Sequence, residues 1–175
     1  MFKTKIIKSI WLILFISISS SCAYFNTFYN AEKYYQEADI IRKEKEGREI
    51  PLSALDKYGK SIQKSQVVLD KFPNSKLKLK AMLLISKSRF FRKDYANALN
   101  QLKLIEFEAT SDLLVETKYW QAMCKWKLGK PQTAINELLI IIDDSDKNSF
   151  MANSYLSLSD IYLEQNDQEN MLLYL

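Results

Sequence analysis

Two short stretches decide the fold of this chain: RKDYANAL at residues 92–99 and LGKPQTAI at residues 128–135. Each is a tight polar turn between two long apolar-patterned runs, with Asp94 at the turn in the first and Gly129 at the turn in the second. Glycine, aspartate and proline commonly end one helix and open the next. Both stretches therefore predict two helices joined by a tight turn.

The same arrangement extends to both sides of these turns, because apolar residues recur at three- and four-residue intervals, as on one face of a helix. The sequence GREIP at residues 47–51 and the turn at Asn166-Asp167 supply the remaining breaks. The chain is thus expected to form a first helical hairpin over about 26–46 and 52–72. A second begins with a helix over about 77–92, turns at Lys93-Asp94 and continues through Ile105. A third runs from near Leu113 through a turn at 129–131 to Ile142, and a fourth runs from near Phe150 through the turn at 166–167 to Leu175.

The second helices of these hairpins repeat at a nearly constant spacing. Corresponding points are Ser61, Ala98, Ala134 and Met171, which are separated by steps of 37, 36 and 37 residues. A fixed period is typical of repeat proteins, in which each hairpin stacks on the next.

Composition agrees with an all-α class. The chain of 175 residues is 47% hydrophobic and 26% charged, with only three glycines and three prolines. It is long enough for one globular domain plus a short extra segment. Without Lys3, Lys5 and Lys8 near the N-terminus, the 25 basic residues fall to 22, against 21 acidic ones. This near neutrality argues against a nucleic-acid partner.

The two deciding stretches resemble the tetratricopeptide repeat, a helix-turn-helix unit of 34 residues. The resemblance places Ala98 and Ala134 as the small residues packed between helices. Small residues fill the close-contact position of the first helices, and an aromatic residue stands in the last repeat: Ser86, Ala122, Ser159 and Tyr162. The longer period, and Ser61 and Met171 in place of alanine, depart from the family. The resemblance implies a right-handed solenoid over residues 22–175.

A narrower resemblance rests on LDKFPNS at residues 69–75, which ends the first hairpin. This ending is similar to that of bacterial barrel-assembly lipoproteins of the BamD type. The resemblance implies an outer-membrane assembly adaptor.

The N-terminus has the order of an export signal. Three lysines precede the apolar run IWLILFISI at residues 10–18, and three serines then lead to Cys22. The apolar run is well under the ~20 residues that a membrane-spanning helix needs. Residues 1–21 resemble a bacterial lipoprotein signal peptide, although Ser19 stands where an aliphatic residue is usual. The resemblance implies acylation of Cys22, while an ordinary signal peptide with an incidental thiol is the alternative.

Two further features bear on the anchor. Ala23 after the cysteine resembles lipoproteins that are sorted to the outer membrane, where the chain would face the periplasm. Cys124, the second cysteine, lies in a helical apolar stripe and is expected to be a small buried hydrophobe rather than a disulfide partner.

Stacked first helices would line a groove for extended or helical segments of partner proteins. Residues of these helices that look exposed are the candidate partner-binding groove: Lys87, Arg89, Arg92, Lys118, Gln121 and Lys125. Their positive charge would suit acidic partner segments or anionic head groups. The alternative is a solvated face that keeps the protein soluble.

The sequence offers little for catalysis, cofactors or metals. Histidine is absent, which removes the commonest general base, and the three glycines are too far apart for a phosphate loop. DDSDKN at residues 143–148 begins like a calcium loop, but Ser149 stands where glycine is required and Tyr155 where a bidentate glutamate is required. The pair Glu106 and Glu108 is most simply interpreted as surface solvation.

Aromatic residues gather just after Cys22. Phe28 and Tyr35 have helical spacing and are expected in the core, whereas Tyr24, Phe25 and Tyr29 could instead lie at the lipid head groups.

Two function classes follow from the sequence, and neither is an enzyme. One is a lipid-anchored scaffold that assembles outer-membrane proteins. The other is an adaptor or regulatory subunit of a secretion, wall-remodelling or uptake complex. Because Leu175 falls inside a predicted second helix, the chain is also expected to be part of a longer repeat protein.

Overall fold

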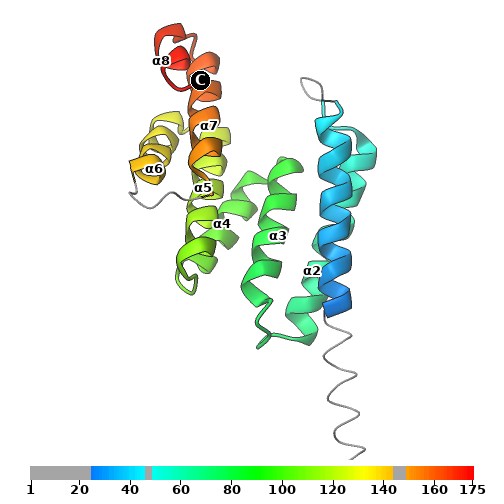
Figure 1. Ribbon diagram of the computed structural model, residues 1–175. Coiled ribbons are helices and arrows are strands. Elements are labelled where there is room, and N and C mark those ends of the chain that lie inside the picture. The colour runs from blue at the N-terminus through cyan, green and yellow to red at the C-terminus, as the bar shows by residue number, and fades with distance from the viewer. Residues whose placement is uncertain (1–24, 46–48, 144–148) are drawn as a thin grey trace, which may run out of the picture. The chain divides into compact units, whose positions relative to one another are not determined.

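The protein is all-helical in the computed structural model, which describes residues 25–45, 49–143 and 149–175 and contains no strand in those ranges (Figure 1). None of the helices in these ranges is long and apolar enough to span a membrane. The expected signal peptide, Cys22, Ala23, Tyr24 and most of the calcium-like loop lie outside the described residues.

The chain divides into two compact units, of which the first ends at Ala81. In this unit a helix over 25–43 runs antiparallel to α2, Leu52–Lys71 (Figure 1). Ala31, Ala38 and Ala54 of these two helices are fully buried. A ring contact joins Tyr35 to Tyr58 at 5.6 Å between centroids.

The second unit begins at Met82, inside α3, Lys78–Phe91. Its other helices are α4, Tyr95–Glu106; α5, Ser111–Lys127; α6, Pro131–Asp143; α7, Met151–Glu164; and α8, Gln168–Leu173. The middle helix α5 packs against α4 and α6, and α7 packs against α6 and α8. Consecutive helices are therefore neighbours in space.

Three turns in this unit share one conformation. Lys93, Gly129 and Asn166 have positive φ angles of 63°, 77° and 59°. At each turn the next residue donates its backbone N–H to the carbonyl five residues earlier, as Asp94 does to Arg89 at 3.0 Å. This Schellman geometry satisfies carbonyls that a helix end would otherwise leave open. The turn positions predicted from the sequence are confirmed, with the same steps of 36 and 37 residues.

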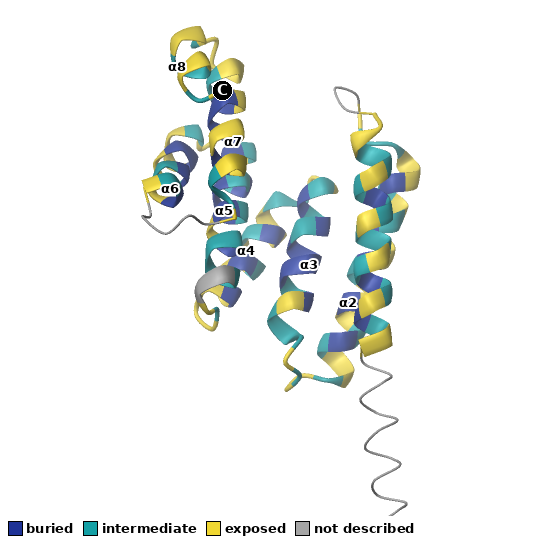
Figure 2. Ribbon diagram, in the orientation of Figure 1, coloured by how far each residue is buried: buried dark blue, intermediate teal, exposed yellow. Residues whose placement is uncertain are grey.

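The bounds predicted for α2 and α3 agree with the structure to within one residue, whereas the first helix ends at residue 43, followed by a turn at 44–45, rather than continuing to 46. The hydrophobic core of the second unit joins α5, α6 and α7 around Tyr119, Leu138 and Ile161. Buried residues face the neighbouring helices, and exposed ones face outward (Figure 2).

The small residues that the sequence analysis singled out are buried. Ser61, Ala98 and Ala134 are fully buried, and the first-helix set Ser86, Ala122 and Ser159 is at most 5% exposed. Met171 is only half-buried.

Candidate partner-binding pocket

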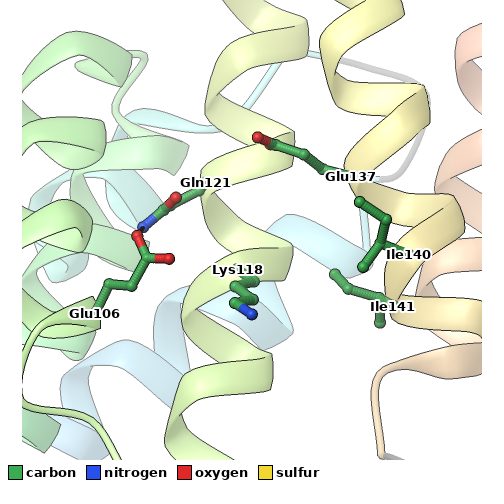
Figure 3. A pocket seen from close by; sticks show the side chains of 6 residues that line it. All are labelled: Glu106, Lys118, Gln121, Glu137, Ile140 and Ile141. Atoms are coloured by element: carbon green, nitrogen blue, oxygen red, sulfur yellow. Dashed lines mark hydrogen bonds between the residues drawn. The ribbon is translucent and has the colours of Figure 1, made fainter. Parts of the chain in front are cut away.

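The second unit has a pocket of about 200 Å³ on α5, between α4 and α6. It is lined by Glu106, Lys118, Gln121, Glu137, Ile140 and Ile141 (Figure 3). In the view of Figure 3, Glu106 and Gln121 lie on one side, the two isoleucines lie on the other, and Lys118 lies between them. The pocket therefore combines an apolar wall with a polar one.

The polar wall is held by hydrogen bonds between helices. Gln121 is only 6% exposed and donates from Nε2 to Oε2 of Glu106 at 2.9 Å, which joins α5 to α4. Lys125 forms an ion pair with Oε1 of Glu137, which joins α5 to α6. The pocket walls are thus fixed relative to one another before any partner binds.

One hydrogen-bond acceptor in the pocket wall has no donor among the described residues. The Oε2 atom of Glu137 is buried and accepts no hydrogen bond from the described residues. A buried carboxylate oxygen without a donor is costly, since it has lost its water shell. Since this oxygen is out of reach of a ligand, the accessible features of the pocket are the exposed Ile140 and the ammonium group of Lys118.

The apolar wall is partly open. Ile141 is 4% exposed and belongs to the core, whereas the neighbouring Ile140 is 65% exposed. Lys118 is exposed and is the cation at the rim of the pocket. An apolar side chain next to a charged rim is the usual composition of a protein-binding pocket.

The six residues predicted for the groove do not form one surface. Lys118 and Gln121 line the pocket, and Lys125 supports it through Glu137. The prediction that Gln121 is exposed is wrong, because the contact with Glu106 draws its amide between α5 and α4.

Lys87 and Arg89 of α3, and Arg92 just after it, do not line the pocket. Lys87 bridges to Glu116 of α5 at 2.7 Å, and Arg89 donates to Gln101 of α4 at 3.0 Å. Arg92 is exposed near the end of α3. These cations, expected to meet partners, therefore largely serve helix packing, since their acidic and amide neighbours belong to adjacent helices.

The sequence analysis missed Glu137, Ile140 and Ile141 as site residues, and it assigned Glu106 to surface solvation. The sequence does contain a pattern from which the contact of Glu137 could have been predicted. Lys125 and Glu137 carry opposite charges and lie twelve residues apart, on either side of the turn at Gly129. Arg89 and Gln101 have the same relation one repeat earlier. An antiparallel hairpin brings such pairs together.

Two other predictions concern single side chains. Cys124 is fully buried, as expected, and burial raises the pKa of its thiol to about 12. Phe28 is 6% exposed and packs in the core, whereas Phe25 and Tyr29 are 54% and 64% exposed. Core packing is thus confirmed for Phe28 and excluded for Phe25 and Tyr29, whose exposure agrees with the alternative of a place at the lipid head groups; their contact with lipid remains a prediction.

Comparison with known proteins leaves the family open. No protein family matches the chain, and no curated protein matches it as a relative. Within the described residues, no three cysteine or acidic side chains cluster as metal ligands would.

Proposed function

We propose that this chain is a lipid-anchored, protein-binding scaffold of the bacterial envelope, which serves as an adaptor in outer-membrane protein assembly. Its helices would form a right-handed solenoid of tetratricopeptide-like hairpins, and Cys22 would carry the anchor. The protein would face the periplasm and would need neither a cofactor nor a metal.

The observation that carries the repeat proposal is a set of equivalent contacts across three turns. Arg89 bonds to Gln101, Lys125 pairs with Glu137, and Tyr162 stacks on Tyr174 with 5.6 Å between ring centroids. Each pair is twelve residues apart, and successive pairs are offset by 36 and 37 residues. Different chemistry in the same geometry supports a common backbone unit repeated three times.

The pocket on α5 supports a binding role. It offers Ile140 as an apolar contact and Lys118 as a cation at the rim. A partner helix or extended segment could place one apolar side chain against Ile140, with an acidic group toward Lys118. The area of a single pocket is small, so neighbouring helix surfaces must contribute to any stable complex.

The proposal of a lipid anchor is supported by the sequence of residues 1–22 alone. Acylation would add two or three chains to Cys22, which hold a protein on a membrane stably, whereas one chain binds only marginally. The exposed rings of Phe25 and Tyr29 follow shortly after this cysteine and suit the level of the lipid head groups.

The test is site-specific photo-cross-linking in intact cell envelopes, followed by mass spectrometry. A photoreactive residue replaces Ile140 in the pocket, and a matched variant carries it at Gln132, an exposed residue of α6 that does not line the pocket. We expect partners from the outer-membrane assembly machinery to be cross-linked from position 140 and not from position 132. A Cys22→Ala variant should lose them.

Each other outcome overturns a stated part of the proposal. Wall enzymes or inner-membrane transporters as partners would favour the alternative of an adaptor subunit in a secretion, wall-remodelling or uptake complex. Equal cross-linking from 132 and 140 would remove the pocket from the binding site. Unchanged partners in Cys22→Ala would remove the lipid anchor.

A further inference from the structure

Charge is distributed unevenly over the first unit. Residues 25–31 and 64–81 form the start of the first helix, the end of α2 and the loop into α3, and they contain five lysines and a single acid, Asp70. Residues 32–63, between them, contain seven basic and seven acidic residues. We call residues 25–31 and 64–81 the lysine end, because its net charge is +4 while the remainder of the hairpin is neutral.

Two contacts fix the register of the first helix against α2. Glu37 pairs with Lys57, and the ring of Tyr35 meets that of Tyr58. Counting equally along the two antiparallel helices from these pairs places Phe25 level with residues 68–69. The end of α2 and the loop after it therefore lie at the same end of the hairpin as the start of the first helix (Figure 1).

The lysines of this end differ from those in the rest of the hairpin. Lys71, Lys76 and Lys80 are exposed, and they form no ion pair within the described part of the chain. Lys43 and Lys60, in contrast, pair with acids on their own helices at 2.9 and 2.8 Å. The positive charge of the lysine end is thus available to a ligand from outside the chain.

The loop between α2 and α3 holds these lysines on a hydrogen-bonded backbone. The N–H of Ser75 donates to the carbonyl of Phe72, and the N–H of Lys78 donates to the carbonyl of Ser75, both at 3.0 Å. A loop that is already ordered loses little freedom when it binds. Its lysines can therefore act together on one charged surface.

Chain geometry keeps this end close to Cys22. Three residues lead from Cys22 to Phe25, and a fully extended chain covers at most about 11 Å over that distance. An acyl anchor on Cys22 would therefore bring the lysine end to the membrane surface. The rings of Phe25 and Tyr29, 54% and 64% exposed, suit the level of the lipid head groups at the same end.

We infer that the lysine end binds anionic lipid head groups through Lys71, Lys76 and Lys80. Lipid phosphates are the anions that exposed ammonium groups meet next to a membrane. The inference rests on the proposed lipid anchor, which brings this end to the surface. Since two or three acyl chains already hold a protein stably, the lysines determine which end of the hairpin faces the lipid, not whether the protein is attached.

The test is photolabelling of the full chain in nanodiscs by a lipid with a photoreactive head group, followed by mass spectrometry of the labelled peptides. Nanodiscs of phosphatidylcholine alone are compared with nanodiscs that also contain phosphatidylglycerol. The test variant is Lys71→Gln/Lys76→Gln/Lys80→Gln.

The matched control is Lys43→Gln/Lys45→Gln/Lys60→Gln, which removes three exposed lysines from the neutral part of the hairpin. Residue 43 ends the first helix, 18 residues after Phe25, and lies about 27 Å farther along its axis. This distance is beyond the reach of the surface charge of a membrane, which salt screens within about 8 Å under physiological conditions.

We expect the label in residues 71–80 to be at least about threefold higher with phosphatidylglycerol than without it. The test variant should lose this difference, and the control variant should keep it. Salt at about 1 M should also abolish the difference, because the Debye length then falls to about 3 Å.

Equal labelling in the two kinds of nanodisc, or equal loss in both triple variants, would overturn the inference. Equal labelling together with binding of a soluble polyglutamate peptide that requires the three lysines would assign them to an acidic protein segment instead. The intact mass of the protein reports acylation of Cys22 separately. An unacylated Cys22 would overturn the proposed anchor, whereas the labelling comparison decides the present inference in either case.

Discussion

Three residues that end helices in the second unit have the left-handed conformation, and only one of them is glycine. Gly129 takes this conformation without cost, whereas Lys93 and Asn166 hold it with a side chain present. Asparagine tolerates left-handed angles better than most residues, and lysine does so poorly. Lys93 is therefore the strained member of the set.

Substitutions at these turns should change stability in opposite directions. A Cβ added at Gly129 would meet no atom within 4 Å, so Gly129→Ala creates no clash. The substitution should lower stability only because alanine disfavours the left-handed backbone conformation of this residue. We expect it to lower the free energy of unfolding by about 1 kcal/mol, and Lys93→Gly to raise it by up to about 1 kcal/mol. Chemical denaturation followed by circular dichroism measures both. A loss of stability in Lys93→Gly would contradict the strain argument.

Cys124 should be unreactive in the folded protein. Its thiol is fully buried, and burial raises its pKa to about 12, so only about one molecule in 10⁴ carries a thiolate at pH 8. In a Cys22→Ser variant, where Cys124 is the remaining thiol, Ellman's reagent should react slowly at pH 8 and rapidly in concentrated guanidinium chloride. Rapid reaction of the native protein would show that the α5 core opens readily.

At the scale of helices, the contacts between α5 and α7 combine packing with one buried hydroxyl pair. The Tyr119 and Ser157 side chains are both buried, and their hydroxyl groups form a hydrogen bond with each other. Burial also raises the pKa of the Tyr119 phenol, so this group stays protonated beyond its usual range. Loss of either hydroxyl leaves the other without its partner.

A double-mutant cycle tests this pair. We expect Tyr119→Phe and Ser157→Ala each to lower the free energy of unfolding by about 1 kcal/mol. The double variant should cost less than the sum by about 0.5–1 kcal/mol, because the second substitution removes a group already left unpaired. Urea denaturation of the four proteins supplies the numbers. Strictly additive losses would mean that the two hydroxyls do not stabilise each other.

At the scale of the second unit, stability depends on neighbouring helices sharing one core. Leu138 of α6 is fully buried in the cluster that also contains Tyr119 of α5 and Leu158 of α7. Since consecutive hairpins bury each other's apolar faces, damage at one helix should spread to its neighbours.

Leu138→Ala should lower the free energy of unfolding by about 2–5 kcal/mol, the usual cost of a leucine cavity. Ile140→Ala, two residues away on the same helix but 65% exposed, is the matched control and should change stability by less than about 0.5 kcal/mol. Hydrogen exchange should show faster amide exchange in α5, α6 and α7 together for the leucine variant. Loss of protection confined to α6 would mean that the helices do not share a cooperative core.

The sequence by itself determined the helices, their turns and their period. Residues such as Asp94, Gly129 and Asn166 act on the backbone next to them, so the positions of the three turns in the second unit could be predicted closely. The fully buried Ala98 and Ala134 could also be located, since the period alone assigns them equivalent positions.

Only the tertiary structure decided which polar side chains meet partners and which meet one another. Gln121 looked exposed on α5, yet it lies against Glu106 of α4, while Lys87 pairs with Glu116 and Lys125 with Glu137. The pocket likewise depends on which helix lies beside which. A helix face has the same sequence whether another helix or water covers it, and long-range packing determines which of the two does.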